Sequence, residues 1–404
     1  MTDDFDPVGS GVAPPDLLLR LMAREGWEEP YAIHRDARSQ GAVAWSEVGV
    51  GLVTGHAACS QVLKSGEWLA DSRRNPAMPS DLPPEDVSLL SLDPPDHTRL
   101  RKLVSSSFSA RSIERLSQVA ASYAAQLVHA AVQAGDVDVM QSLAYPLPLA
   151  VICRLLGVPQ EDRTRIGRWG YELAPGLDLA LTGPPPASVV EASAEVDRYF
   201  RDLIDRKRGQ PSDDLVGRLL EAERDGAEVS ELELLSLCTL ILLAGFVTTV
   251  NLIGNGVALL LDHPEQLRAC AADPELLNNA VEEVLRFGSP VQYTARFPAI
   301  DTRLGDASFV AGQHALLLLG AANRDPQVFA DPERFDVSRS NASEHLAFAT
   351  GIHHCLGAAL ARLEARALFT ALLDQAPNML PVGPAVLRPV KNLRGFEQLP
   401  VRLR

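Results

Sequence analysis

The sequence predicts a mainly α protein with small β-sheets (an α+β fold), arranged around one long buried helix. Apolar residues recur at helical spacing through most of the chain, as in ELELLSLCTL and ALARLEARALFTALLDQ. Segments with the alternation or turn signals of strands are short and few. No repeat of fixed period, low-complexity tract or linker interrupts residues 1–404, so we expect a single domain.

Composition and charge restrict the class of protein and its partners. Hydrophobic residues make up 46% of the chain, enough to bury a large core. The 52 Asp and Glu against 37 Lys and Arg give a net charge of -15, which favours solubility and argues against nucleic acid as a partner. The cysteines form no close pairs, and the N-terminus MTDDFDPVGSGVAPP lacks the basic and apolar parts of a secretory signal. We therefore expect reduced thiols and a cytoplasmic location.

Residues 234–261 are expected to form the long buried helix. The segment has no charged residue and is long enough to cross a bilayer. However, Glu233 and Asp262 flank it, where a membrane helix favours Lys or Arg. Four polar residues in its middle would be unpaired in hydrocarbon: Thr248, Thr249, Asn251 and Asn255. Ser230 and Glu233 form a capping-box pattern at its start, so we favour a core helix over a membrane span.

Two short segments indicate strands. Residues 42–55, AVAWSEVGVGLVTG, alternate and turn like a hairpin, and residues 303–326 are expected to contain a second strand pair before a loop. Two long loops are rich in proline, at residues 71–96 and 175–188. Long irregular loops in a compact domain are often binding lids, so we expect both to border a ligand site.

Cys355 lies in the segment HLAFATGIHHCLGAALARLEAR, residues 345–366. Zinc is disfavoured although His353 and His354 precede the cysteine, because adjacent side chains diverge and zinc ligands usually come as spaced pairs. A buried structural cysteine is the simplest alternative.

The surroundings of Cys355 favour a different metal. Gly351 and Gly357 permit close backbone approaches, and the helix that begins after Cys355 points its N-terminus at the sulfur, which favours a thiolate. Phe348 adds a flat apolar wall. A covered thiolate on a tight loop is what an axial ligand of haem iron requires.

The segment FATGIHHCLG resembles the haem-binding signature of the cytochrome P-450 family, F-x-x-G-x-H-x-C-x-G. Other motifs similar to those of the family follow in the expected order over nearly the whole chain. The resemblance implies the cytochrome P-450 fold, heme b (iron protoporphyrin IX) with the Cys355 thiolate as axial ligand, and O₂ as co-substrate. The implied activity is that of a monooxygenase, an oxidoreductase that inserts one oxygen atom by hydroxylation or epoxidation.

Four residues match the family's contacts to the haem propionates. His97 and Arg101 are four residues apart and project from one face of a helix, although a solvated basic face would explain this spacing equally well. Arg296 and His353 match two further contacts. Propionates covered by protein need cationic or hydrogen-bonding partners, and we expect these residues to provide them.

Glu283 and Arg286 are three residues apart on a helix, a spacing typical of surface ion pairs. With Arg334 in DPERF they resemble the family's Glu-x-x-Arg and Pro-Glu-Arg-Phe elements. The resemblance implies a buried charge network that braces the haem side and does not contact substrate.

The segment AGFVTT, residues 244–249, lies in the middle of the long helix. Gly245 costs about 1 kcal/mol there relative to alanine, and a helix-packing notch would explain it together with Ala244. In the family this notch makes room for O₂, and the threonine matching Thr248 hydrogen-bonds the oxygen and helps deliver protons.

Val247 departs from the family pattern, which usually has Asp or Glu at this position. Cleavage of the O–O bond consumes two protons, and a positioned acid or base contributes about 10²- to 10⁴-fold. No carboxylate lies within residues 234–261. Either water held by Thr248, Thr249 and Asn251 carries the protons, or a substrate group does, or the reaction depends less on proton delivery.

The substrate pocket is expected to be mainly apolar and to suit a hydrophobic or amphipathic small molecule. Its walls are assigned to residues 71–92, residues 170–195, Leu243 to Val247, Val291 to Thr294, and the turn near Phe396. The chain is most similar to actinobacterial members that tailor antibiotics and polyketides, so the resemblance implies a role in secondary metabolism, although fold does not fix substrate.

Soluble bacterial members of the family receive electrons from a small acidic ferredoxin and its reductase. A local basic patch would attract such a partner despite the net charge of -15. Five residues in the two helices expected beside the cysteine would form it: Arg101, Lys102, Arg111, Arg362 and Arg366. We expect no membrane partner, and we expect a monomer.

Two other functions remain open. The same scaffold could couple phenols or close rings, on a free or a carrier-tethered substrate, and Val247 favours this alternative. A non-catalytic haem-thiolate sensor of gas or redox state is the second, although a sensor would not need the Ala-Gly-x-x-Thr notch.

Overall fold

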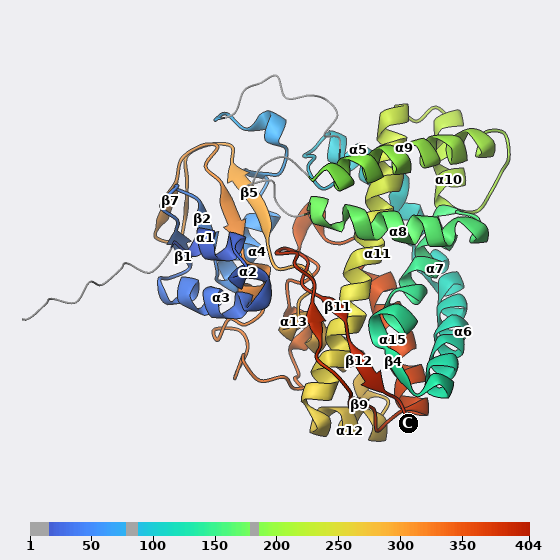
Figure 1. The fold of residues 1–404 in the computed structure, drawn as a ribbon. Helices are drawn as coiled ribbons and strands as arrows, with labels where there is room; N and C mark the ends of the chain where they lie inside the picture. The colour runs from blue at the N-terminus through green and yellow to red at the C-terminus, as the bar shows by residue number, and fades with distance from the viewer. Residues whose placement is uncertain (1–15, 78–87, 178–185) are drawn as a thin grey trace, which may run out of the picture.

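The computed structural model describes residues 16–77, 88–177 and 186–404. Figure 1 shows a helix-rich part and a smaller sheet-containing part on either side of one long central helix, α11. The helices are α1 (Leu17–Met22), α2 (Glu25–Glu28), α3 (Pro30–Ser39), α4 (His56–Lys64), α5 (Asp96–Ser105), α6 (Ala110–Ala134), α7 (Pro146–Leu156), α8 (Arg163–Leu173), α9 (Ala187–Lys207), α10 (Leu215–Arg224), α11 (Glu231–Asp262), α12 (Pro264–Ala272), α13 (Leu276–Phe287), α14 (Leu319–Ala322) and α15 (Ala358–Gln375).

The strands are short, as predicted for a mainly α fold. They are β1 (Val43–Trp45), β2 (Gly51–Val53), β3 (Trp68–Leu69), β4 (Asp136–Asp138), β5 (Thr294–Pro298), β6 (Thr302–Leu304), β7 (Ala307–Phe309), β8 (Ala315–Leu317), β9 (Leu380–Pro381), β10 (Val386–Leu387), β11 (Phe396–Gln398) and β12 (Pro400–Arg402). The largest sheet has the order β1-β2-β8-β5-β3. The hairpin predicted within residues 42–55 is confirmed, because β1 and β2 pair antiparallel. In the second predicted segment β6 and β7 form the pair, while β8 joins the large sheet in parallel with β2.

Helix α11 is a core helix and not a membrane span. Its sequence is long and apolar enough to cross a membrane, but most of its apolar stretch is buried inside the protein. It packs against α7, α8, α9, α13 and α15. The predicted capping box is present: Glu233 N–H donates to Ser230 Oγ at 3.2 Å, and Ser230 N–H donates to Glu233 Oε2 at 2.7 Å. Burial of its apolar side chains by five helices replaces the lipid that such a sequence would otherwise require.

Small residues let other helices approach α11 closely. A Cβ on Gly256 would lie 2.3 Å from Phe369 Cζ of α15, and a Cβ on Gly170 of α8 would lie 2.8 Å from Phe246 Cδ1 of α11. Helix α15 also packs along α6 and α13. These contacts fix the position of the segment that precedes α15, which carries Cys355.

The two proline-rich loops are only partly described. The first contains the short turn η1 (Ser72–Arg74) and leads into α5, but its residues 78–87 lie outside the described residues. The second loop connects α8 with α9, and its residues 178–185 lie outside them too. The prediction that both loops border a ligand site therefore stays a prediction.

Candidate active site

Cys355 lies on a tight loop just before α15. Its N–H donates to the carbonyl oxygen of Phe348 at 2.9 Å, which closes the loop that we call the cysteine loop (residues 348–357). Gly351 has φ +74°, and a Cβ there would lie 2.1 Å from the carbonyl oxygen of Leu63. The predicted need for glycine is thus confirmed at this position, because any side chain would strain the backbone and collide with the end of α4.

Gly357 does not need to be glycine for the same reason. A Cβ there would meet only Phe108 Cε1, at 3.9 Å, which is ordinary contact. Its contribution is instead its N–H group, which hydrogen-bonds the Cys355 sulfur. The sequence-based prediction about close backbone approach is wrong at this position.

Cys355 differs from the other cysteines in its exposure. Its residue is exposed, whereas Cys59, Cys153, Cys238 and Cys270 are buried. Within the described residues no group of three or more His, Cys, Asp or Glu side chains is arranged to hold a metal ion, so His353, His354 and Cys355 do not form a zinc site. An accessible sulfur as the single protein ligand would suit a haem iron, because the porphyrin itself would supply four of the iron's ligands.

The peptide N–H at the helix N-terminus favours the Cys355 thiolate, as predicted, but in the protein alone a larger influence outweighs it. Burial by the surrounding atoms raises the pKa of the Cys355 thiol, although the Gly357 N–H and the charges of Arg101 and Arg362 act in the opposite direction. The three lowering influences are too weak to offset desolvation. A coordinated metal deprotonates a thiol outright, so the thiolate depends on the iron and not on the helix N-terminus alone.

Arg362 and Phe348 support the cysteine loop from α15. The Arg362 guanidinium carbon lies 4.5 Å from the centre of the Phe348 ring. Arg362 Nε and Nη2 both donate to the Glu282 carboxylate of α13 at 2.7 Å. Although burial opposes it, hydrogen bonds from Arg362 and His345 lower the pKa of Glu282 to about 2. Glu282 was missed from the sequence, because nothing local links it to a residue of α15.

The four residues assigned to the propionates come together beside the cysteine loop. The rings of His97 and His353 lie 4.4 Å apart. Burial, followed by the charges of Arg296, His97 and Arg101, lowers the pKa of His353 to about 3, and burial lowers the pKa of Arg296 to about 10. We call His97, Arg101, Arg296 and His353 the haem-edge cluster.

The haem-edge cluster lacks acidic partners. Among the described residues, neither ring nitrogen of His97 has a hydrogen-bond partner, nor has Nε2 of His353. Arg296 donates only to Thr294 Oγ1 at 3.3 Å and to the Ala295 carbonyl oxygen at 2.6 Å. Buried donors and charges without partners are costly, so an anionic group belongs here. Two propionates beside the exposed sulfur fit this requirement, and the residues therefore fit a haem.

Arg101 has a second function that the sequence did not indicate. Its Nη2 donates to the His354 carbonyl oxygen at 2.6 Å, so α5 is tied to the backbone directly before Cys355. This bond orients the cysteine loop as well as placing a positive charge near the sulfur.

Glu283 and Arg286 form the predicted buried ion pair. Both side chains are fully buried, with Arg286 Nε and Nη2 donating to the carboxylate at 2.7 and 2.8 Å. Arg286 also donates to three backbone carbonyl oxygens, of Asn323, Pro332 and Arg334. The pair is therefore fully hydrogen-bonded.

Arg334 does not enter this network through its side chain, which corrects the sequence-based assignment. Its guanidinium is 65% exposed and lies 3.6 Å from Asp336. The charged side chain that reaches Glu283 is Arg339, with Nε at 3.2 Å from Oε1. The turn at residues 331–334 directs the Arg334 side chain to solvent while its carbonyl oxygen faces Arg286. We call Glu283, Arg286 and Arg339 the charge network.

The small residues of α11 form a partly exposed stripe. Ala244, Gly245 and Thr248 are partly exposed, whereas Phe246 and Val247 are buried. Ala244 and Thr248 are one turn apart and share a helix face. Gly245 also accommodates α7, because a Cβ there would lie 2.8 Å from Ile152 Cδ1. The helix-packing explanation thus holds for Gly245, while the stripe leaves room on its accessible side.

Both threonines bond to their own helix. Thr248 Oγ1 donates to the Ala244 carbonyl oxygen at 2.6 Å, and Thr249 Oγ1 donates to the Gly245 carbonyl oxygen at 3.0 Å. Each hydroxyl oxygen can still accept a hydrogen bond. The buried side chain of Val247 provides neither a proton nor an acceptor.

The predicted pocket residues are only partly brought together. Leu243 lies on the same turn as the notch, and Val291 forms a β-bridge with Leu393, a residue that the sequence did not point to. Thr294 lies two residues before Arg296 on β5, so both side chains point to one face of the sheet. Phe396 lies elsewhere, next to Gly254 of α11 and near Met140. Gly254 is six residues beyond Thr248 along the helix. The Leu393 carbonyl oxygen accepts from Asn251, only three residues beyond Thr248, so Leu393 meets α11 nearer to the notch than Phe396 does.

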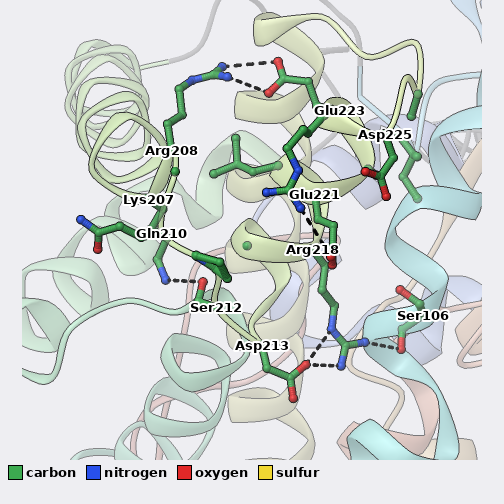
Figure 2. Close-up of a pocket in the computed structure, with 18 of the residues that line it drawn as sticks. Ser106, Lys207, Arg208, Gln210, Ser212, Asp213, Arg218, Glu221, Glu223 and Asp225 are labelled. Carbon is green, nitrogen blue, oxygen red and sulfur yellow. Dashed lines mark hydrogen bonds and ion pairs between the residues drawn. The ribbon is translucent and has the colours of Figure 1, made fainter.

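A large open hollow on the surface is separate from this site. It has a volume of about 1430 Å³ and is lined by residues of α5, α9, α10 and the segments between them, with none from α11 or the cysteine loop. Figure 2 shows that its charged side chains pair with one another, as Arg208 does with Glu223 and Arg218 with Asp213. These pairs neutralise each other within the hollow, so they give no indication of a charged ligand there.

Three features define a haem-thiolate protein: an exposed cysteine ligand, a convergent cluster of two arginines and two histidines with no acidic hydrogen-bond partner among the described residues, and a small-residue notch in a buried helix. Comparisons with known proteins give the family. A family model described as Cytochrome P450 matches residues 188–375. The chain is 39% identical over 408 residues to the cytochrome P450 monooxygenase PikC of Streptomyces venezuelae. The match covers 98% of this chain and 96% of PikC.

Two further relatives agree. The chain is 37% identical over 393 residues to 6-deoxyerythronolide B hydroxylase of Saccharopolyspora erythraea, covering 93% of this chain and 96% of the hydroxylase. The ligand-free crystal structure of CYP164A2 from Mycobacterium smegmatis has a TM-score of 0.89 and 38% identity, covering 96% of this chain and 99% of that chain. The chain belongs to the cytochrome P450 family, and it is a haem-dependent monooxygenase of the bacterial type.

Proposed function

We propose that this monooxygenase hydroxylates or epoxidises a hydrophobic or amphipathic small molecule in the biosynthesis of a secondary metabolite such as an antibiotic. The observation that carries the proposal is a set of apolar residues at the middle of α11: Leu243 precedes the notch in the helix, and Val291 bridges to Leu393, whose carbonyl oxygen accepts from Asn251 Nδ2. Its full-length similarity to a hydroxylase that acts on 6-deoxyerythronolide B supports a substrate of this kind. When bound, the haem supplies the oxidising chemistry. The residues of this chain bind and orient the substrate and deliver protons.

A spectral titration tests this function. Purified haem-loaded protein is titrated with polyketide lactones, steroids and fatty acids while the Soret band is followed. We expect at least one apolar compound to shift the band, and turnover with that compound to yield a product heavier by one oxygen atom in mass spectrometry. Binding confined to small hydrophilic compounds would contradict the proposal.

We propose that a small acidic ferredoxin and its reductase supply the electrons. We also propose that the enzyme is a monomer and that it acts in the cytoplasm. The basic side chains beside the cysteine loop support this partner: Lys102, Arg111 and Arg366 are exposed, while Arg101 and Arg362 are committed to His354 and Glu282. Charge reversal at Lys102 should therefore slow reduction by ferredoxin and weaken its dependence on salt, because steering charges act on association rates. Stopped-flow reduction at two ionic strengths measures this effect, with Arg402→Glu as a control on a distant surface. Unchanged rates for the Lys102 variant would argue against this docking face.

Oxidative coupling or ring formation, on a free or carrier-tethered substrate, is the second candidate. The buried Val247 at the usual acid position favours it, because a phenol substrate would bring a hydroxyl group that can supply protons in place of an acid in α11. Mass spectrometry separates the two functions, since coupling lowers the mass by two hydrogens. A sensor without turnover would show no substrate-dependent O₂ consumption with ferredoxin and reductase.

A further inference from the structure

A buried arginine lies against the segment of α11 that lacks an acid. Arg388 follows β10 and is only 4% exposed. Its Nη2 donates to the hydroxyl of Tyr145, and its guanidinium carbon lies 4.8 Å from the centre of the Tyr171 ring. Burial lowers its pKa to about 10 despite the opposing influence of Glu397, so Arg388 stays charged at neutral pH. A charge this deeply buried needs a function or a partner.

Two contacts place Arg388 along α11. Tyr145 packs against Phe246, with ring centres 5.9 Å apart. The Arg388 N–H donates to the Gly395 carbonyl oxygen at 3.0 Å, and Gly395 is so close to α11 that a Cβ on it would lie 2.2 Å from Asn251 Oδ1. Phe246 and Asn251 are on either side of Val247 in the sequence, and Asn251 is one turn beyond Val247 on the same helix face.

Two polar atoms in this region lack partners. Among the described residues, neither Arg388 Nε nor Asn251 Oδ1 makes a hydrogen bond, and both are buried. The first is a donor and the second an acceptor. Buried polar groups that the protein leaves unpaired are commonly satisfied by ordered water with two to four polar partners. Arg388 Nε and Asn251 Oδ1 therefore offer the donor and the acceptor that a buried ordered water needs.

The cluster extends from the notch toward solvent. At its inner end Asn251 lies three residues after Thr248, so the two side chains are neighbours on the helix surface. At its outer end Tyr171 is 39% exposed, and its hydroxyl donates to Glu397 Oε1 at 3.4 Å. The negative charge of Glu397, in the same hairpin, raises the pKa of Arg388. A titratable group at the outer end and hydroxyls at the inner end are the two terminals that a proton route requires.

We propose that Arg388 and Asn251 hold an ordered water that passes protons to Thr248, in place of the carboxylate that the family pattern usually has at position 247. The water would give a proton to the Thr248 hydroxyl oxygen while the hydroxyl's own proton went to the co-substrate oxygen in the notch. The hydroxide left behind would regain a proton from bulk solvent by way of Glu397 and the Tyr171 hydroxyl. Arg388 keeps its proton throughout and is a positioning residue. This inference rests on the monooxygenase function but not on the identity of the substrate.

The first test is structural. A high-resolution crystal structure of the haem-loaded enzyme should show a water within hydrogen-bond distance of both Arg388 Nε and Asn251 Oδ1. In Asn251→Leu this water should be lost while the protein stays folded with its haem. A wild-type structure in which a side chain, and not water, satisfies these two atoms would overturn the inference.

The second test measures coupling. With ferredoxin, reductase and 6-deoxyerythronolide B as the probe, Asn251→Leu and Arg388→Met should lower product formed per NADPH about tenfold and raise peroxide release. Val247→Glu added to Asn251→Leu should restore part of the coupling, which a merely structural defect would not allow. Glu397→Gln, at the surface, tests the outer end if the buried variants fold poorly, and it should raise the solvent isotope effect.

The matched control is Glu223→Gln, a partly exposed acid in the surface hollow of Figure 2. It should leave peroxide per NADPH unchanged. If Asn251→Leu, Arg388→Met and Glu397→Gln all kept the wild-type ratio of product and peroxide to NADPH, the inference would be overturned. If the wild type oxidises no compound, the proposed function fails while the crystallographic water still decides the inference.

Discussion

The molecule has two buried clusters of charge near the cysteine loop, and they are built in opposite ways. In the charge network every group has a partner: Arg286 donates to Glu283 and to three carbonyl oxygens, and Arg339 completes the carboxylate. In the haem-edge cluster His97 has none among the described residues, and Arg296 has only neutral ones. The difference teaches that a satisfied cluster stabilises the fold, whereas an unsatisfied one is kept for a ligand.

The nearest acid illustrates the contrast. Asp93 is buried near Arg296 and His97, and its charge influences both. Its carboxylate, however, accepts from the backbone N–H groups of Ala70 and Asp71 at 3.0 to 3.2 Å. Among the described residues, Asp93 is the acid whose charge reaches both Arg296 and His97, and its carboxylate is held by these backbone groups, which leaves the cluster open to the propionates.

Breaking the charge network should have the largest effect on the fold. Glu283→Gln keeps the size of the side chain but leaves Arg286 as an uncompensated buried charge. We expect a loss of about 3–5 kcal/mol in the free energy of unfolding, measured from guanidinium denaturation of the haem-free protein. Glu223→Gln, at a partly exposed pair that solvent screens, should cost less than about 1 kcal/mol. Equal losses in the two variants would show that full pairing is not what makes the network structural.

His34 sharpens the comparison, because it is unpaired but distant from the haem-edge cluster. Neither ring nitrogen has a partner among the described residues, and burial, with the charges of Arg324, Arg38 and Arg394, lowers the pKa of His34 to about 3. The unfolded chain binds the proton near pH 6.5 and the folded chain does not. Stability is therefore unaffected above pH 7 and falls by about 1.4 kcal/mol per pH unit below about 6.5, until the pH reaches about 3.

The pH dependence of unfolding between pH 7 and 5 checks this expectation. His34→Leu should remove a loss of about 2 kcal/mol from this interval. It should not change haem retention, because His34 lies on α3 and the haem-edge residues lie on α5, β5 and the cysteine loop. A variant with the wild-type slope would mean that His34 is protonated in the folded protein.

Removing one charge from the haem-edge cluster should affect haem binding more than folding. Arg296→Met removes a buried charge that has only neutral partners, so the haem-free protein should be at least as stable as the wild type. The haem-loaded protein should lose a charge-assisted bond worth about 1.5–3 kcal/mol, or roughly 10- to 100-fold in haem affinity. Haem transfer to apomyoglobin measures the second quantity and denaturation the first. A variant that lost stability but kept its haem would reverse the assignment of this cluster.

The sequence predicts the parts of the site that lie within one segment. Gly351, Phe348 and Cys355 belong to one short loop, and their spacing is enough to foresee a presented sulfur. The convergence of His97, Arg296 and His353 was available only through resemblance, because these residues come from three distant segments. The contact of Leu393 with Val291 and the position of Phe396 depend on how the C-terminal hairpin docks, and no local pattern encodes docking.

Electrostatic balance is the other quantity that the sequence did not provide. The helix N-terminus before α15 was expected to favour the thiolate, yet desolvation raises the pKa of Cys355. Similarly, Val247 was recognised as a missing acid, but the buried Arg388, whose Nε has no partner among the described residues, could not be foreseen, because it belongs to a loop far along the chain. Burial of a group is a property of the assembled fold and is not contained in its neighbours in sequence.

The smallest expected effect comes from Arg334, and it tests whether the network was drawn at the correct residue. Arg334→Gln removes a guanidinium that is 65% exposed and 3.6 Å from Asp336, while the carbonyl oxygen that Arg286 uses remains. We expect a change of less than about 0.5 kcal/mol in the free energy of unfolding. Arg339→Gln, in contrast, removes the partner of Glu283 at 3.2 Å and should cost about 1–3 kcal/mol. If the two costs were reversed, the side chain of Arg334 would have to turn inward in solution, and the sequence-based assignment would be correct after all.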